Sequence, residues 1–471
     1  MGSDGRGTRF RKGTLGYTTG GLILLFFYLL WGDFCMQIME VVVQSVLPLQ
    51  LKSLGASNTV MALLVTTLPS IMNLSVNPMI SFRSDSFRSS MGRRLPFLIF
   101  ATPFVTLFLI LVAFAPEIGG YLSRASSLRG LGLSPASVII GTMAVLLVLF
   151  QFFNFCLMPV YCYLFVDVVP DAVIGRFVAL FRVVATLSSY VFNTFLLGHA
   201  LTHTREIYIG AALLYLIGFG IVCWRVREGK YPPPVHVNRL GLHRTIGIYM
   251  RECYSHPHYL LFNVRNALYY LSTVVGMYAV FVFRDEVGLP LEFIGKINGW
   301  NCLIIAVLLF PMAILADRFK PVRIILLGSL PMVVLPPIAF FFLHDKTSYV
   351  ILALLGLPFV ALMAAAEMPF HISILPRERF GQFGSANQIV TALTVIVGSF
   401  LAGRFIDWTT LGGTRLSGYR YLYWWQFVCQ SLSLVAMVFM YRSWRRHGGP
   451  SNYIPPTVAS ASGDDHPGEC G

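Results

Sequence analysis

Residues 97–116 read FLIFATPFVTLFLILVAFAP, a run without a single charged side chain. A helix rises 1.5 Å per residue, so a run of about 20 residues spans the hydrocarbon core of a bilayer, which is roughly 30 Å thick. Similar runs recur along the whole chain, for example at residues 349–363. In hydrocarbon every backbone amide needs a partner, which a helix supplies within itself. The repeated runs therefore predict an α-helical protein that crosses the membrane many times.

The composition supports the same interpretation. The chain has 471 residues, of which 56% are hydrophobic and 12% are charged, whereas a soluble domain carries about 25% charged residues. We predict an all-α polytopic membrane protein with twelve transmembrane helices. The predicted spans are residues 21–50, 57–81, 95–115, 136–165, 175–200, 206–226, 258–283, 291–315, 321–343, 347–371, 381–405 and 420–441.

The basic residues are distributed unevenly between the predicted loops. With both termini in the cytoplasm, the inner segments and their flanks hold 23 of the 35 Lys and Arg residues, and the outer ones hold ten. This excess on one side sets the orientation of membrane proteins. We therefore predict a multi-pass protein of the plasma or inner cell membrane with both termini in the cytoplasm. The net charge of +14 is explained by this placement, so nucleic acid is not an expected partner.

No metal or redox chemistry is indicated by the cysteines. All eight stand singly, mostly inside apolar runs, and none has the spacing of a metal ligand pair. We expect no metal site and no cofactor apart from a coupling ion, H+ or Na+.

The chain divides into two halves of six spans. The predicted parts are a cytoplasmic tail (1–20), a six-helix bundle (21–226), a central cytoplasmic loop (227–257), a second six-helix bundle (258–445) and a disordered cytoplasmic tail (446–471). The pattern P-x4-G-x-F follows the fourth span at 170–177 and the tenth at 376–383. Asp85 with Gly92-Arg93-Arg94 follows the second span, and Asp317-Arg318 follows the eighth. Such internal repeats are typical of secondary transporters, whose site lies between the repeats.

These loops resemble those of the major facilitator superfamily. In that superfamily the loop between helices 2 and 3 typically reads G-x-x-x-D-R-x-G-R-R; here Ser81 takes the place of the first glycine, and Ser86 follows Asp85. The longer segment that ends in residues 92–97, GRRLPF, is similar to the glycoside-pentoside-hexuronide:cation symporters and the sucrose transporters. Trp31-Gly32-Asp33-Phe34 in the first span is similar to the same group. The resemblance implies two pseudo-symmetric six-helix bundles and transport by alternating access.

Charged and glycine residues in the inner loops are candidates for a cytoplasmic gate. A carboxylate such as Asp85 can pair with Arg93, Arg94 or Arg176 and latch neighbouring helices until the inner face opens. Alternatively, Arg93 and Arg94 anchor the helix at anionic headgroups. The predicted gating residues are Asp85, Arg93, Arg94, Asp167, Gly175, Arg176, Asp317, Arg318, Arg377 and Gly381.

The first span carries a stripe of polar residues. Asp33, Gln37, Glu40 and Gln44 follow one another at helical spacing and share one face. A carboxylate near the middle of a span is costly, so it faces protein or water and is a functional candidate. We predict Asp33 as the coupling carboxylate, Glu40 as its assistant and Glu367 as a further candidate, each able to take a proton or share a sodium ion.

A sugar needs side chains that donate and accept hydrogen bonds at fixed angles, and aromatic faces for its C–H surface. The predicted substrate-binding residues are Gln37, Asn154, Arg265, Asn266, Tyr269, Trp300, Asn301 and Asn387. Any single amide here can instead join two helices. Arg265 can neutralise Asp33, which is its predicted partner, or Glu40, or it can hold an acidic solute in a bidentate contact.

We therefore predict a cation-coupled transporter of a small polar solute, a sugar or glycoside, that works as a monomer in the lipid bilayer. One alternative keeps the fold but transports an organic anion or exports an amphiphile. Another is a membrane assembly factor without transport. An enzyme is not expected, because no nucleophile–base pair or phosphate-binding glycine loop is present in the sequence.

Overall fold

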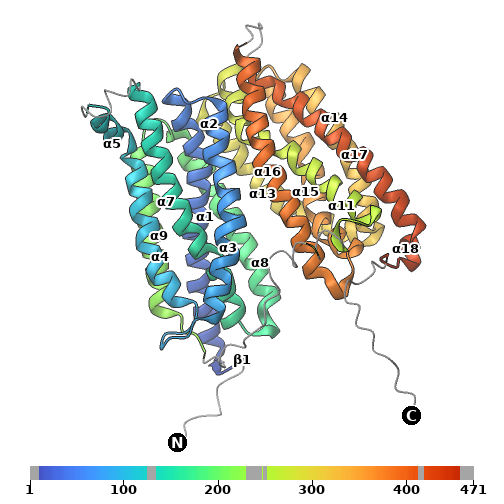
Figure 1. Cartoon of the computed structure of the whole chain (residues 1–471), viewed down its shortest axis with the longest axis horizontal. Helices are drawn as coiled ribbons and strands as arrows, with labels where there is room; N and C mark the ends of the chain where they lie inside the picture. The colour runs from blue at the N-terminus through green and yellow to red at the C-terminus, as the bar shows by residue number, and fades with distance from the viewer. Residues whose placement is uncertain (1–9, 125–133, 230–246, 248–251, 412–417, 457–471) are drawn as a thin grey trace, which may run out of the picture. The chain divides into compact units, whose positions relative to one another are not determined.

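The structure is a computed structural model that describes residues 10–124, 134–229, 247, 252–411 and 418–456. Over these residues the chain is almost entirely helical (Figure 1). Twelve helical segments among them are long and apolar enough to cross a membrane. The predicted all-α fold with twelve membrane-spanning helices is confirmed.

Each spanning segment overlaps one predicted span. The first half contains α1 (Thr19–Ser53), α2 (Asn58–Ala62), α3 (Leu68–Ser86), α4 (Leu95–Ala113), α5 (Ala115–Leu122), α7 (Pro135–Val168), α8 (Ile174–Val191) and α9 (Thr204–Arg225). The second half contains α11 (Pro257–Thr273), α12 (Ala279–Phe281), α13 (Leu291–Phe319), α14 (Pro321–Phe342), α15 (Lys346–Ile374), α16 (Phe380–Leu411), α17 (Leu422–Arg446) and α18 (Gly449–Asn452). A single π-helical turn, Leu63–Thr67, joins α2 to α3.

Local sequence explains where several helices begin. Proline stands in the first turn of α4, α7, α11 and α14, where its missing N–H is not needed. The Ser134 hydroxyl caps α7 by accepting from the N–H of Ser137 at 3.1 Å. Asp345 and Ser348 form a capping box at the start of α15, and the Ser348 N–H lowers the pKa of the Asp345 carboxyl.

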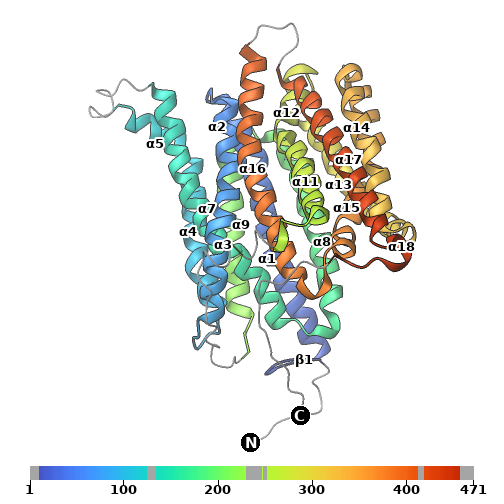
Figure 2. The same ribbon diagram turned by 45° about the vertical axis from the view of Figure 1, so that its right-hand side comes forward.

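Unit 1 of the chain comprises Met1–Val235, Gly276–Ala306 and Ser399–Tyr419. It therefore joins the first six spans to short segments of the seventh, eighth and eleventh. Within it α1 packs on α8 and α9, while α7 packs on α3 and α4 (Figures 1 and 2). Gly218 allows close approach of α9 to α1, since a Cβ there would lie 2.5 Å from Cys35 Sγ.

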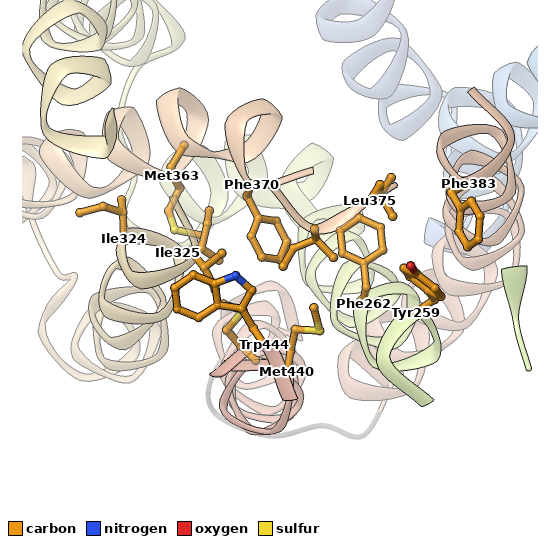
Figure 3. Close-up of a cluster of buried hydrophobic side chains, with 14 of the residues drawn as sticks. Tyr259, Phe262, Ile324, Ile325, Met363, Phe370, Leu375, Phe383, Met440 and Trp444 are labelled. Atoms are coloured by element: carbon orange, nitrogen blue, oxygen red, sulfur yellow. The ribbon is translucent and has the colours of Figure 1, made fainter. Parts of the chain in front are cut away.

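Unit 2 comprises His236–Val275, Val307–Gly398 and Arg420–Gly471. Its core is an apolar cluster to which α11, α14, α15, α16 and α17 all contribute (Figure 3). Phe262, Phe370 and Trp444 are among its large side chains, and each is at most 3% exposed. These rings hold the helices of unit 2 in place around the polar residues described next.

Both tails contain more structure than the sequence predicts. Strands β1 (Phe10–Lys12) and β2 (Leu15–Tyr17) form a hairpin inside the predicted N-terminal tail. At the other end, α18 follows α17, and the Tyr453 hydroxyl donates to the carbonyl of Ile374 at 2.8 Å. The beginning of the tail predicted to be disordered is therefore folded onto unit 2, whereas residues 457–471 lie outside the described residues.

Candidate functional site

Unit 1 contains a cavity of about 510 Å3 between α1, α3 and α7. Its wall combines apolar and aromatic surface with carboxyl, amide and hydroxyl groups. The polar lining residues are Glu40, Gln44, Asn73, Asn77, Gln151, Cys162 and Tyr163. Such a wall offers donors and acceptors at several fixed points, and its volume is that of a small-molecule site.

Glu40 is the predicted coupling residue that reaches this cavity. It lines the wall together with Gln44, which follows it by one turn of α1. Asn154 Nδ2 on α7 donates to Glu40 Oε1 at 2.6 Å. Asn154 is only 1% exposed, so this predicted substrate residue positions the Glu40 carboxylate at the cavity wall.

Asp33 lies about two turns before Glu40 on α1 and is fully buried. Gln37 Nε2 lies 3.4 Å from its Oδ1, while no described residue provides a hydrogen bond to its Oδ2. The neighbouring Gly32 packs against Tyr161 of α7. Asp33 and Gln37 are not among the described residues that line the 510 Å3 cavity, so the predicted stripe divides into Glu40 and Gln44 at the cavity and Asp33 and Gln37 away from it.

Unit 2 holds a second polar centre around Arg265. Its Nη1 donates to Glu367 Oε1 at 2.8 Å and to Asn266 Oδ1 at 2.7 Å. The guanidinium carbon lies 4.9 Å from the centroid of the Tyr269 ring and 5.2 Å from that of Phe370. The aromatic faces and the carboxylate together stabilise a cation that is fully buried.

Amide side chains extend this centre across three helices. Asn266 Nδ2 lies 3.1 Å from His371 Nε2 and donates to Asn387 Oδ1 at 3.3 Å. Asn387 Nδ2 in turn donates to Asn263 Oδ1 at 2.9 Å. The structure thus brings together the predicted residues of α11, α15 and α16, and adds Asn263 and His371.

The ion pair of Arg265 differs from the one predicted. The sequence favours Asp33 or Glu40 as its partner, but the guanidinium pairs with Glu367. Glu367 and Arg265 lie on α15 and α11 of the same unit. Arg265 therefore pairs with a carboxylate on a helix of its own unit. The sequence shows that Asp33, Glu40 and Glu367 all lie inside spans, but it does not show which of them lies near Arg265.

Trp300 and Asn301 lie on the part of α13 that belongs to unit 1. The Trp300 ring is 56% exposed, and its centroid lies 6.2 Å from that of Tyr190 on α8. Asn301 is half-buried. Neither lines the 510 Å3 cavity described above.

At the predicted cytoplasmic end of unit 1, charged residues form a compact group that we name the arginine cluster: Ser84, Asp85, Arg93, Arg94, Asp167 and Glu228. Arg93 donates to both oxygens of Asp167, at 2.9 and 2.5 Å. Arg94 donates to Asp167 Oδ2 at 3.1 Å and also bonds Asp85 and Ser84. Of the three partners that the sequence allows for Asp85, the structure selects Arg94; Gly175 and Arg176 are exposed.

Glu228 is a member of this cluster that the sequence did not reveal. Its carboxylate accepts the backbone N–H groups of Arg93, Arg94 and Leu95 at 3.0, 2.8 and 2.6 Å. These are the free donors at the beginning of α4, where a negative charge is stabilising. Glu228 lies far along the chain in the segment after α9, so no local motif indicates its role.

The corresponding loops of unit 2 are built differently. Asp317, Arg318 and Arg377 are exposed, and Gly381 lies in the first turn of α16. Lys320 adopts a φ of +71° where the first half has Gly92 at +112°. The predicted gating residues of the two halves therefore occupy similar loops without making the same contacts.

The arginine cluster leads to a testable expectation. Arg94 is 3% exposed, so Arg94→Ala removes the bonds to Ser84 and Asp85 and one of the two guanidinium groups on Asp167, which then keeps Arg93 alone. We expect transport to slow by about tenfold or more while solute affinity stays within about threefold, as measured by initial rates and equilibrium binding. Arg176→Ala, at an exposed arginine of the next inner loop, is the matched control. Equal rates for Arg94→Ala and the wild type would leave Arg94 as a headgroup anchor.

A second polar group lies at the opposite end of unit 1. Asp407 on α16 accepts four hydrogen bonds from the beginning of α2: from N and Nδ2 of Asn58 at 2.8 and 2.9 Å, and from N and Oγ1 of Thr59 at 3.0 and 2.6 Å. Tyr278 and Tyr419 donate to the two oxygens of Asn58 at 2.6 and 2.7 Å. We name these five residues the Asn58 cluster.

Close backbone packing accompanies the Asn58 cluster. A Cβ on Gly403, one turn before Asp407, would lie 2.7 Å from Thr59 Cα. Asn58 is 3% exposed and all of its polar atoms are bonded. The cluster therefore closes that end of unit 1 by joining the first half of the chain to segments of the second half.

A family model described as Major Facilitator Superfamily matches residues 29–399. A search of curated proteins found no match.

Several solved transporters have a similar fold. A mutant of the nucleoside transporter NupG is 10% identical, with a TM-score of 0.66 over 88% of this chain and 100% of that one. A bacterial homologue of the iron transporter ferroportin, in an inward-facing state, is 15% identical, with a TM-score of 0.64 over 89% and 99%. A D-xylose-proton symporter is 14% identical, with a TM-score of 0.56 over 89% and 98%. At these identities the similarity shows the fold alone.

Proposed function

Because the chain belongs to the Major Facilitator Superfamily, we propose that it is a secondary transporter of a small, uncharged solute with several hydroxyl groups, such as a sugar or glycoside. It is an integral membrane protein with twelve spanning helices. Transport by alternating access would be coupled to a proton or sodium gradient. The specific resemblance to the glycoside and sucrose transporters, noted in the loops, supports the same substrate class.

The composition of the 510 Å3 cavity carries this proposal. Gln44, Asn73, Asn77 and Gln151 place four side-chain amides around one space. Each amide offers two donors and one acceptor, which matches hydroxyl groups that both donate and accept. Phe155 and the apolar lining residues add surface for the C–H faces of a ring.

Coupling is assigned to the carboxylates of α1. Glu40 faces the same cavity as the amides, so an ion bound there would sense the solute directly. Asp33 is buried behind it with one oxygen that no described residue satisfies. An unpaired charge in the membrane interior is costly, which favours a proton- or ion-bound form of each carboxylate. Because Glu40 lines the cavity, we propose it as the leading coupling residue, a role that the sequence analysis predicts for Asp33.

An organic anion is the second candidate, and one observation favours it. Nε and Nη2 of Arg265 are buried, and no described residue accepts a hydrogen bond from them. Two such N–H groups can hold a carboxylate in a bidentate contact. Glu367 already neutralises Arg265 through Nη1, so an anion at Nε and Nη2 would bring a second negative charge to this buried centre.

Uptake into proteoliposomes distinguishes these functions. We suggest labelled sucrose, a phenyl β-glucoside and glucuronate as solutes, each with and without imposed proton and sodium gradients. Gradient-driven accumulation of a neutral glycoside is the expected result. Transport of glucuronate alone would support the anion, and transport of none of them would contradict the proposal.

Orientation is open to a direct measurement. We propose that both termini lie in the cytoplasm, as the distribution of basic residues indicates. A cysteine introduced between residues 225 and 258, in a variant without the native cysteines, should not react with an impermeant reagent added to intact cells. His344→Cys, in a predicted outer loop, is the control that should react. The opposite labelling pattern would invert the topology.

A further inference from the structure

A row of polar side chains runs along α3 between the cavity and the arginine cluster. Asn77 Nδ2 donates to Asn73 Oδ1 at 2.9 Å, and Ser81 Oγ donates to Asn77 Oδ1 at 3.0 Å. Ser81 Oγ also lies 3.1 Å from the hydroxyl of Tyr163 on α7. We name these four residues the α3 ladder.

One end of the ladder is part of the cavity wall. Asn73, Asn77 and Tyr163 all line the 510 Å3 cavity. Asn73 accepts from Asn77 through its oxygen, and no described residue accepts from its own two N–H groups, which leaves them for a ligand. A hydroxyl-rich solute in the cavity would therefore meet the ladder at its amides.

The other end touches Arg94 in two ways. The Arg94 guanidinium carbon lies 5.0 Å from the centroid of the Tyr163 ring, a cation–π contact. Arg94 Nη1 also donates to Ser84 Oγ, and that hydroxyl donates to the carbonyl of Ser81 at 3.0 Å. Ser81 thus bonds the cavity amide of Asn77 directly. A single residue, Tyr163 on one route and Ser84 on the other, separates it from Arg94.

The contacts of Ser81 are unusual for a serine in a membrane helix. Such hydroxyls commonly bond the preceding turn of their own helix, as Ser75 does by donating to the carbonyl of Ile71 at 2.7 Å. Ser81 instead bonds side chains of two helices. It is also the position at which the sequence has serine in place of the glycine of the motif that it resembles.

We propose that Asn73 and Asn77 bind hydroxyl groups of the solute, and that Ser81 and Tyr163 transmit occupancy of the cavity to Arg94. This inference rests on the proposed function, because it names further substrate residues of the same cavity. A solute hydroxyl that donates to Asn77 Oδ1 shares with Ser81 an oxygen that has two lone pairs, and so weakens the bond from Ser81. Ser81 then relies more on Tyr163, and a shift of the Tyr163 ring changes its contact with Arg94.

The binding half of this proposal is tested by equilibrium binding of the three labelled solutes to purified protein. Loss of one neutral hydrogen bond is worth about 1 kcal/mol, which corresponds to roughly fivefold in affinity. Asn77→Ala and Asn73→Ala should therefore weaken binding by about fivefold or more. Ser75→Ala, on the same helix, should bind as the wild type does. Unchanged affinity in both asparagine variants would overturn the assignment.

The transmission half needs a reporter beside the arginine cluster. Met91→Cys, in the exposed turn before Arg93, serves in a variant without the native cysteines. Saturating solute should change its rate of labelling by several-fold. Ser81→Ala should bind solute within about twofold of the wild type, but solute should no longer change the labelling rate in this variant. In Ser75→Ala the solute should still change the labelling rate. If solute still changes the labelling rate in Ser81→Ala, the ladder joins α3 to α7 without transmitting occupancy of the cavity.

The two proposals fail in different ways. Binding of glucuronate but not of either neutral glycoside would contradict the proposed substrate class, and the ladder would be measured with glucuronate, whose hydroxyls can make the same contacts. Normal binding of a neutral glycoside, with no effect of the asparagine or Ser81 variants, would overturn the ladder alone. Binding of none of the three would overturn both. Melting temperatures of the variants show whether each remains folded.

Discussion

Replacement of Glu40 by glutamine should reduce gradient-driven accumulation of solute by about tenfold or more, while counterflow of solute continues. Glutamine keeps the size of the side chain and can still meet the Asn154 amide, but it cannot take up and release a proton or bind sodium as a carboxylate does. Counterflow exchanges bound solute and does not require the ion to be released. Accumulation and counterflow measured in the same proteoliposomes therefore separate coupling from binding.

Asp33→Asn is the informative companion of this variant. Asp33 is fully buried and bonds Gln37, so we expect it to lower the apparent ion affinity less severely than Glu40→Gln does. Glu117→Gln, at an exposed carboxylate paired with Arg205, should accumulate solute normally. If Glu40→Gln accumulates solute as the wild type does, the coupling carboxylate must be sought at Asp33 or Glu367.

The helices and the repeated loops could be predicted because their signals are local. Apolar runs predict the spans one by one, and the spacing from Asp85 to Arg94 places a carboxylate and a guanidinium beside the same helix end. The structure accordingly pairs these two residues. The hairpin in the N-terminal tail also has a local signal. Its two-residue turn between β1 and β2 contains Gly13, which adopts a φ of +54°, and glycine is typical of such turns.

The contacts that were missed join residues far apart in the chain. Glu228 caps α4 from the segment after α9, and Asp407 caps α2 from α16. Each is a single acidic residue at the end of a predicted span. From the sequence alone, such a residue can equally well be exposed to solvent, so its capping role cannot be predicted. Which span ends meet depends on how helices pack, and this information is not contained in any one segment. The partner of Arg265 was missed for the same reason.

The cavity illustrates a further limit. The sequence singles out polar residues in the spans, but it does not say which side of each helix is open. Asn154 was predicted to bind substrate, yet its amide holds Glu40. Asn73 and Asn77 stand in a predicted span without charged residues and are not among the predicted site residues, although both line the cavity. Their spacing of four residues on α3 was the one signal that could have identified them.

Replacement of Asp407 by alanine is expected to have the second large effect. The change removes a carboxylate that accepts four hydrogen bonds. The backbone N–H groups of Asn58 and Thr59 at the beginning of α2 then lose this acceptor. Hydrogen bonds to a charged group contribute about 1.5–3 kcal/mol each. If the Asn58 cluster closes the predicted outer end during alternating access, its loss should favour the outward-open state and slow transport by about tenfold or more.

Cys162 is a native reporter for this change, because it lines the 510 Å3 cavity. With the other cysteines replaced by serine, its labelling by an impermeant reagent from outside should become several-fold faster in Asp407→Ala. Thr410→Val is the matched control on α16, since among the described residues the Thr410 hydroxyl bonds only carbonyls of its own helix, those of Ile406 and Asp407. Tyr278→Phe and Tyr419→Phe each remove one hydrogen bond to Asn58 and should have smaller effects in the same direction. Labelling of Cys162 that stays at the wild-type rate in Asp407→Ala would mean that the cluster holds α2 in place without gating the cavity.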